Sequence, residues 1–243
     1  MSPVFGASEH SSESRGSAEQ FHLTQMNLAL IGPSGAGKGT QAAQLVARFS
    51  LLCISTGDLF RDHLKNKTEL GALIQDYLDK GELVPDRVAD ATLEEWLRVS
   101  DPGRGILFDG YPRTVRQAKF LERLMFGLEL PLTAVVHLSI SDEEVIHRLS
   151  ERQGCRVCQA PFHKTSHPFQ SCPYNQCQGE HLVQRGEDDP ERILTRLRVF
   201  HQETEPLISH YHEMEKLVEV DAARDVAHVT QSILQSLQRL GKD

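Results

Sequence analysis

The sequence predicts an α/β fold with a parallel five-stranded sheet flanked by helices. Short apolar runs at Asn27 to Ile31, Ile106 to Phe108, Ala134 to Ile140 and Leu217 to Val220 are each followed by a helical pattern, and a fifth strand-like run surrounds Cys53. Runs of this kind are typical of strands that are buried on both faces. Their alternation with helices indicates parallel strands joined by helical crossovers.

Helix-start signals place two helices around an unusual segment. Ser141, with Glu144 three residues later, forms the pattern of a capping box for a helix through Glu151. Asp189 before Pro190 provides an N-cap with proline at the first helical position. The segment between these helices holds four of the five cysteines and has no apolar periodicity. We therefore expect it to form a small lobe of its own.

The chain divides into a core, made of residues 26–54, 85–150 and 189–243, and two inserted lobes. Residues 55–84 contain two helical stretches and no strand signal, and residues 151–188 form the cysteine lobe. Residues 1–25 are rich in Ser and Glu and lack the apolar segment of a secretory signal. We expect a disordered tail there, or a start codon assigned upstream of the true one.

Charge and composition exclude several classes of protein. The 243 residues carry a net charge of -8, which gives no basic field for nucleic acid or an anionic membrane. No apolar run approaches the ~20 residues of a membrane helix. We expect a soluble, cytoplasmic protein that binds neither nucleic acid nor membranes and meets anionic ligands with locally clustered arginines.

A glycine-rich run, Gly32-Pro-Ser-Gly-Ala-Gly-Lys-Gly-Thr40, follows the first strand. Its glycines let the backbone curl around phosphate oxygens, and the next helix offers its free N-terminal N–H groups. The side chain of Lys38 can reach the terminal phosphates. Because a strand precedes the run and a helix follows it, the run predicts a phosphate-binding P-loop. The residues expected to contact the nucleotide are Gly35, Ala36, Gly37, Lys38, Gly39 and Thr40.

One position departs from the general phosphate-loop pattern. The residue after the lysine is normally Ser or Thr, whose hydroxyl binds magnesium, but here it is Gly39. Magnesium must then depend on waters, the nucleotide phosphates and a nearby carboxylate. Asp109, at the end of the strand Ile106 to Phe108, is the predicted carboxylate, acting through water, and Asp58 is a weaker candidate.

Three segments in this order resemble the adenylate kinase family: Gly32 to Gln41, Ser55 to Arg61, and Asp109-Gly-Tyr-Pro-Arg-Thr114. The likeness extends from Met26 to about Leu240. It implies reversible transfer of a phosphoryl group from Mg-ATP to AMP, giving two ADP, by a monomeric enzyme. It also implies that residues 55–84 are an NMP-binding lobe and that residues 151–188 are a LID lobe, and that both close over the nucleotides.

Carried over position by position, the resemblance implies an AMP site. Arg113 would hold the AMP phosphate. Gln117 would read the adenine, since an amide offers one donor and one acceptor to a base edge. Thr56 and Arg61 would line the site. The other implied AMP contacts are Glu82, Leu83, Val84, Gly110, Tyr111, Pro112, Arg185 and Arg196.

The resemblance also implies the ATP site. Arg148 and Arg152 are four residues apart, so we expect them on one face of the helix that leads into the cysteine lobe. The first would stack on adenine and the second would contact phosphates. Pro161, Phe162 and the backbone of Arg224 would also contact ATP. The implied catalytic residues are the cations that would stabilise the transferring phosphoryl group: Lys38, Arg113, Arg152, Arg185 and Arg196.

The clustered cysteines predict a structural zinc site of zinc-ribbon type. Cys155-x2-Cys158 and Cys172-x4-Cys177 supply four thiolates in two short knuckles, as in tetrahedral zinc sites. Adenylate kinases with a zinc-bearing lid usually space both pairs by two residues. A histidine could therefore replace the last cysteine, the candidates being His163, His167 and His181. Reduced thiols without metal are the alternative.

Two alternative functions stay open. The chain could be another nucleoside monophosphate kinase, for UMP and CMP or for GTP with AMP, although Thr56 and the long lobe with four cysteines disfavour these. The cysteine lobe could instead be a zinc ribbon that binds nucleic acid or a protein, with the nucleotide fold as regulator. Its few cations and few stacking aromatics disfavour nucleic acid.

Overall fold

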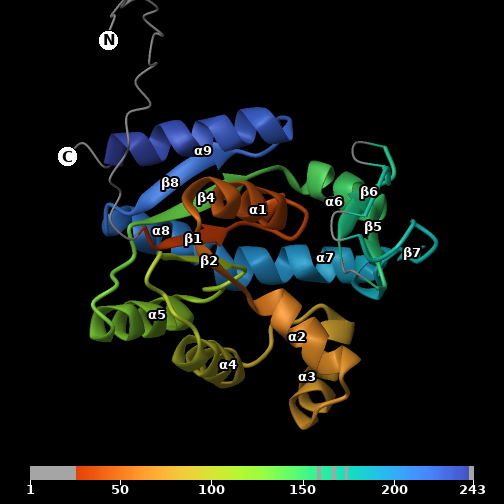
Figure 1. Ribbon diagram of the computed structural model, residues 1–243, viewed down its shortest axis with the longest axis horizontal. Helices are drawn as coiled ribbons and strands as arrows, with labels where there is room; N and C mark the ends of the chain where they lie inside the picture. Colours follow the sequence, from red (N-terminus) through yellow and green to blue (C-terminus); the bar gives the residue numbers. More distant parts are fainter. Residues whose placement is uncertain (1–25, 158–159, 166–167, 173–174, 241–243) are drawn as a thin grey trace, which may run out of the picture.

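The central sheet has the predicted five parallel strands. The computed structural model describes residues 26–157, 160–165, 168–172 and 175–240. The strand order is β2-β3-β1-β4-β8 (Figure 1). The strands are β1 (Leu28–Ile31), β2 (Leu52–Ser55), β3 (Ile106–Asp109), β4 (Ala134–Ser139) and β8 (Leu217–Asp221). Because all run the same way, the loops after β1, β2 and β3 emerge side by side at one edge.

Each face of the sheet is covered by its own helices. Leu28 and Leu30 of β1 pack in one apolar cluster, and Ala29 and Ile31 pack in the other, as the two-residue period of a strand requires. The first cluster includes the buried faces of α1 (Lys38–Phe49) and α9 (Val226–Leu240). The second includes α4 (Asp86–Val99), α5 (Val115–Gly127) and α8 (Pro206–Glu213). Figure 1 shows α4 and α5 on the side of the sheet opposite α9.

Two segments extend beyond this core at one end of the molecule (Figure 1). Between β2 and α4 the chain forms α2 (Thr56–Lys65) and α3 (Glu69–Lys80), which match the two helical stretches expected there. After α6 (Asp142–Ser150) it forms a second, antiparallel sheet of order β6-β5-β7. These strands are β5 (Arg152–Cys155), β6 (Pro161–His163) and β7 (Leu182–Val183).

The chain then returns to the core through a nearly continuous helical stretch. A short 3-10 helix, η1 (Gly186–Asp188), precedes α7 (Pro190–Val199), and a π-helical segment, η2 (Phe200–Thr204), joins α7 to α8. The N–H of Glu205 donates to the carbonyl of Phe200 at 2.9 Å, which is the five-residue spacing of a π-helix. No helix in these described parts of the chain is both long and apolar enough to cross a membrane.

Both predicted helix caps are present. The hydroxyl of Ser141 accepts from the N–H of Glu144, and Asp189 accepts from the N–H of Glu191. The carboxylate of Glu144 pairs with Arg148.

The predicted shared helix face of Arg148 and Arg152 is wrong. Helix α6 ends at Ser150, and Arg152 begins β5, where it pairs with His163 of β6. The chain leaves the helix because strand pairing in the second sheet satisfies its backbone groups.

A buried asparagine connects three parts of the sheet. Asn27 is 1% exposed; its Oδ1 accepts from the N–H of Ile106 at 3.0 Å, and its Nδ2 donates to the carbonyl of Pro131 at 3.1 Å. These bonds join the start of β1 to β3 and to the segment before β4.

We predict that Asn27→Ala lowers the free energy of unfolding by about 1–3 kcal/mol, because the buried N–H of Ile106 and the part-buried carbonyl of Pro131 lose their partner. Chemical denaturation would measure the change. Asn66→Ala is the control: Asn66 is exposed, and its substitution should change the free energy by less than ~0.5 kcal/mol. Equal losses in the two variants would contradict the role given to Asn27.

Candidate active site

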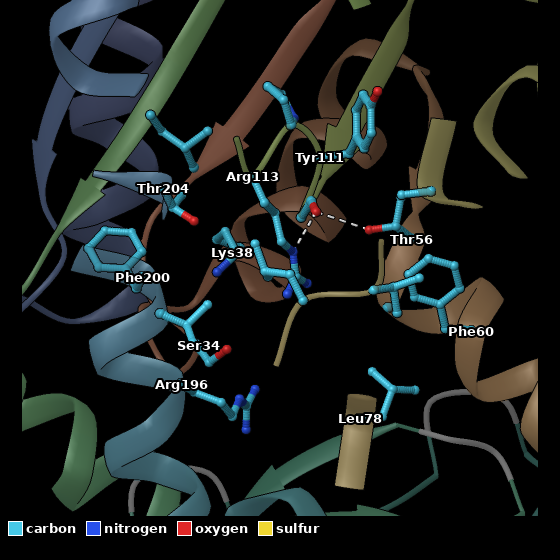
Figure 2. Close-up of a pocket in the computed structure, with 18 of the residues that line it drawn as sticks. Ser34, Lys38, Thr56, Phe60, Leu78, Tyr111, Arg113, Arg196, Phe200 and Thr204 are labelled. Carbon is cyan, nitrogen blue, oxygen red and sulfur yellow. Dashed lines mark hydrogen bonds between the residues drawn. The ribbon is translucent and has the colours of Figure 1, made fainter. Parts of the chain in front are cut away.

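A cavity opens at the edge of the sheet where β1, β2 and β3 end. Its walls come from the glycine loop, α2, residues 81–84, the loop after β3, and the stretch from α7 to η2. Figure 2 shows Lys38, Arg113 and Arg196 pointing into this cavity from three different elements. The parallel sheet thus brings residues that are far apart in sequence to one place.

The glycine loop packs tightly on one side and is open on the other. Gly32 has a φ of 144°, and a Cβ there would lie 2.8 Å from the carbonyl oxygen of Leu138. Gly37, the residue before α1, has a φ of 93°, and no atom lies within 4 Å of the position of a Cβ. A side chain is therefore excluded at Gly32 by contact with β4, whereas Gly37 leaves space in front of the helix N-terminus.

The side chain of Lys38 is hydrogen-bonded to the glycine loop. Its Nζ donates to the carbonyl oxygens of Gly32 and Pro33 at 2.7 and 2.8 Å. Burial lowers the pKa of Lys38 to about 7; Asp109 opposes this lowering, and nearby Arg113 adds to it. An anion that binds beside Lys38 favours the protonated side chain and would raise its pKa.

Asp109, the carboxylate predicted to serve magnesium through water, is the last residue of β3. Its side chain makes no hydrogen bond within the described parts of the chain. Burial raises its pKa, while Lys38 lowers it. A Cβ on Gly39 would lie 3.5 Å from Oδ2 of Asp109, so the two residues singled out for magnesium are neighbours. The weaker candidate, Asp58, forms an ion pair with Arg61.

The loop after β3 holds Arg113 and Thr56 together. The carbonyl oxygen of Gly110 accepts from Nε of Arg113 at 2.8 Å and from the hydroxyl of Thr56 at 3.0 Å (Figure 2). One carbonyl therefore fixes a side chain from its own loop and one from the start of α2.

Gln117 lines the same cavity and is nearly fully buried. Its Oε1 accepts from the backbone N–H of Arg113 at 2.7 Å, and its Nε2 donates to Oδ1 of Asp86 at 2.8 Å. The amide is thus held at both ends.

Two adjacent acids gather the remaining cations. Asp188 is fully buried; it accepts two hydrogen bonds from Arg152, at 2.6 and 2.7 Å, and one from Arg196 at 3.1 Å. The carboxylate of Glu187 lies 3.3 Å from Arg152, 3.5 Å from Arg185 and 3.9 Å from Arg61. We call Glu187 and Asp188 the acidic pair.

The charges of this cluster shift one another's pKa values. Burial opposes the charged form of Glu187, but Arg196, Arg61 and the other nearby arginines lower its pKa to about 2. Burial and the neighbouring Arg152 lower the pKa of Arg185 to about 10. Both groups remain charged at neutral pH, so the cluster is a set of opposed ions.

Most residues predicted for the AMP site line the cavity. These are Thr56, Arg61, Glu82, Leu83, Val84, Gly110, Tyr111, Pro112, Arg113, Gln117 and Arg196. Arg185 instead lines a neighbouring cleft between α2, α3 and the second sheet.

On the predicted ATP side, Arg148 donates to the carbonyl of Ala223 at 3.3 Å, which brings it beside Arg224. The side chain of Phe162 is buried against Phe169 within the small lobe.

Sequence reasoning missed the acidic pair and Asp86 as site residues. The sequence does contain a signal for the acidic pair, because Arg185 is followed by one glycine and then by two acids. Asp86 has no such signal, because it is 31 residues from Gln117 and becomes its neighbour only when α4 packs on α5.

Three of the four clustered cysteines lie in one small apolar cluster. Cys155 and Cys172 are buried, and Sγ of Cys155 lies 3.4 Å from Sγ of Cys177. Cys158 and His167 lie outside the described residues. His163 and His181 lie near the carboxylates of Glu151 and Glu180. Among the residues that the structure describes, no three His, Cys, Asp or Glu side chains form a metal-binding group.

Comparison with known proteins decides the family. The adenylate kinase family model matches residues 30–216, which include the glycine loop and every cation of the cavity. The chain belongs to the adenylate kinase family. It is 41% identical over 213 residues to an adenylate kinase of Caldanaerobacter subterraneus subsp. tengcongensis, covering 87% of this chain and 96% of the relative.

Other relatives of the same name cover the chain to a similar extent. An adenylate kinase of Carboxydothermus hydrogenoformans is 40% identical over 215 residues, covering 88% of this chain and 100% of the relative. One of Staphylococcus aureus is 37% identical over 215 residues, with the same coverage. The predicted family, the α/β fold with its five-stranded parallel sheet, and the enzyme class are therefore confirmed, while the zinc-ribbon character of the cysteine lobe stays a prediction.

For this adenylate kinase family member, the pKa of Lys38 predicts proton uptake on ATP binding. At pH 8 a lysine of pKa about 7 is mostly neutral in the ligand-free protein. Bound phosphates favour its charged form and raise the pKa, so the complex holds more protons than the free protein. We expect uptake approaching one proton per ATP.

Titration calorimetry at pH 8 in buffers of different ionisation enthalpy would measure this uptake. Lys38→Arg is the matched control, because arginine keeps its charge in both states. Equal proton uptake by the wild type and Lys38→Arg would contradict the assignment to Lys38.

Proposed function

We propose that this chain reversibly transfers the terminal phosphoryl group of Mg-ATP to AMP and so forms two ADP. The observation that carries the proposal is the cavity itself: a phosphate-binding loop and a half-buried arginine, Arg113, face one space whose other wall holds Gln117. The relatives named adenylate kinase add support.

The proposed mechanism rests on positioning and charge. The free N–H groups at the start of α1 and the Nζ of Lys38 would hold the phosphates of ATP. Arg113 would hold the phosphate of AMP, with Thr56 and residues 82–84 around the nucleoside. Arg152, Arg185 and Arg196 would turn from the acidic pair toward the transferring group and stabilise its charge.

Closure of the two lobes would exclude water, so that transfer to AMP is faster than hydrolysis. Arg61 of the NMP-binding lobe (residues 55–84) and Arg185 of the LID lobe (residues 151–188) both face Glu187, which makes this residue the meeting point of the two lobes.

Magnesium would enter with ATP and screen the phosphate charge. Asp109 fits the predicted role, because its carboxylate lacks a hydrogen-bonding partner in the described chain and lies beside Gly39. We assign the adenine of ATP to the region where Arg148 meets residues 223–224, with Arg152 toward the phosphates.

We also propose that the LID lobe binds one structural zinc ion. Backbone hydrogen bonds to two of the cysteine sulfurs support this proposal. The N–H of Val157 donates to Sγ of Cys155 at 3.4 Å, and the N–H of Gln176 donates to Sγ of Cys172 at 3.3 Å. Backbone donors of this kind stabilise thiolates, the form that binds zinc. The proposed ligands are Cys155, Cys158, Cys172 and Cys177, and zinc would stabilise the lobe without taking part in transfer.

We propose that the protein acts as a monomer, with the catalytic cations Lys38, Arg113, Arg152, Arg185 and Arg196 supplied by one chain. The cytoplasmic location stays a prediction from the sequence.

A coupled assay of ATP and GTP against AMP, UMP and CMP tests the proposal directly. We expect turnover with ATP and AMP to exceed that of every other pair. Faster turnover with UMP or CMP, or with GTP as donor, would replace the proposal with one of the two related kinases.

We predict that Arg113→Ala lowers kcat/KM for AMP by about 100-fold or more, because a phosphate oxygen loses its charged partner. Arg98→Ala is the control, since Arg98 is exposed and pairs only with Glu94 among the described residues. It should retain wild-type kinetics. Unaltered kinetics in a folded Arg113→Ala protein would refute the role of Arg113.

We predict about one zinc ion per chain after purification without chelators. Elemental analysis would measure it, and both Cys155→Ser and Cys172→Ser should lose zinc and melt at lower temperature. Cys53→Ser is the matched control, because Cys53 lies in β2, away from the cluster, and its substitution should leave the zinc content unchanged. Protein without zinc would remove the metal site and leave the transfer proposal intact.

A further inference from the structure

The direction of the Gln117 amide is determined by its two partners. The backbone N–H of Arg113 can only donate, so the amide atom that faces it must be Oε1. The carboxylate of Asp86 accepts hydrogen bonds, so the atom that faces it is Nε2. The reversed amide would place two donors together at Arg113 and two acceptors together at Asp86.

This direction leaves a defined pair of groups for a ligand. Gln117 makes no other side-chain hydrogen bond in the described parts of the chain, so one N–H and one lone pair remain. Gln117 also lines the cavity. A 6-aminopurine presents a donor at its amino group and an acceptor at N1, which this amide can match. A 6-oxopurine presents the opposite order, an acceptor at the oxygen and a donor at N1.

Asp86 is itself held by its surroundings. It begins α4, and its Oδ2 accepts from Nε of Arg116 at 2.7 Å. The hydroxyl of Thr114 lies 3.2 Å from both carboxylate oxygens. Arg116 reaches in turn to Asp90, one turn further along α4, at 2.8 Å. The carboxylate therefore has one orientation and is fixed between two core helices.

We propose that Asp86 is a positioning residue which, together with the backbone N–H of Arg113, fixes the direction of the Gln117 amide and so selects 6-aminopurine over 6-oxopurine monophosphates. The inference rests on the proposed function, because it concerns the AMP end of the cavity. Asp86 acts through Gln117 and does not itself touch the base. Without its carboxylate the amide keeps one fixed partner, Arg113, and loses the one that orients Nε2.

The test compares AMP with IMP, which differs from AMP at the 6-position and the adjoining N1. In Asp86→Ala we expect the ratio of kcat/KM for AMP to that for IMP to fall about tenfold, the scale of one hydrogen bond. A purely structural role would lower both values together and leave the ratio unchanged. Asp86→Ser, whose hydroxyl can donate or accept and so imposes no direction, should show the same fall and keeps a residue suited to a helix start.

Two controls separate positioning from stability. Asp90→Ala removes the other carboxylate that binds Arg116 and also the partner of the Tyr111 hydroxyl, 2.7 Å away. Arg116→Ala removes both ion pairs but leaves the bond from Gln117 to Asp86. Both should lower the melting temperature and keep the AMP to IMP ratio within about twofold of the wild type.

An unchanged ratio in both Asp86 variants, with AMP still turned over, would overturn the inference alone. A wild-type enzyme that does not phosphorylate AMP would instead overturn the proposed function. An equal fall of the ratio in Asp90→Ala would also overturn the inference, since the side-chain hydrogen bonds of Asp90 in the described chain go to Tyr111 and Arg116 and not to the Gln117 amide.

Discussion

The concentration of arginines around the acidic pair is the constraint on which the site depends. Arg61, Arg152, Arg185 and Arg196 come from α2, β5, a loop and α7, and they meet at Glu187 or Asp188. Partly buried like charges repel one another, and each pays a desolvation cost unless an opposite charge lies close by. Two carboxylates in η1, directly between the second sheet and α7, provide that charge. A chain of net charge -8 can in this way hold a strongly positive site.

Lys38 and Arg113 are also stabilised by acceptors close by, but their acceptors are neutral carbonyl groups. Backbone carbonyls of the glycine loop accept from Lys38, and the carbonyl of Gly110 accepts from Arg113. In the ligand-free protein both side chains therefore have protein acceptors, and phosphate binding would exchange one set of acceptors for another. The gain comes from charge, since a phosphate carries far more of it than a carbonyl. The backbone carbonyls thus keep Lys38 and Arg113 at the cavity, and binding of a phosphate would make them change partners.

The sequence predicted features whose causes are local. The apolar runs form the five strands, and Ser141 and Asp189 cap helices. The glycine loop follows β1 and Asp109 ends β3, and the two lie at one edge because the strands are parallel. The errors and omissions share a different cause. Arg152 left the helix because of pairing with a strand eleven residues away, and η2 follows no α-helical period. Asp86 met Gln117 only through packing of two helices, which residue spacing does not encode.

The two ends of the proposed reaction are built on different supports. Gln117, Asp86 and Arg116 lie on α4 and α5, which pack on the sheet as part of the main core, so the proposed base reader is supported by that core. Arg61, Arg152 and Arg185 lie on the inserted segments, and ion pairs with Glu187 orient their side chains. In the reaction that we propose, recognition of the base would precede closure of the lobes, and closure would bring the arginines to the phosphates. In that order the arginines would reach the transferring group only after the correct purine is bound, because a mismatched base leaves the acceptor phosphate out of place.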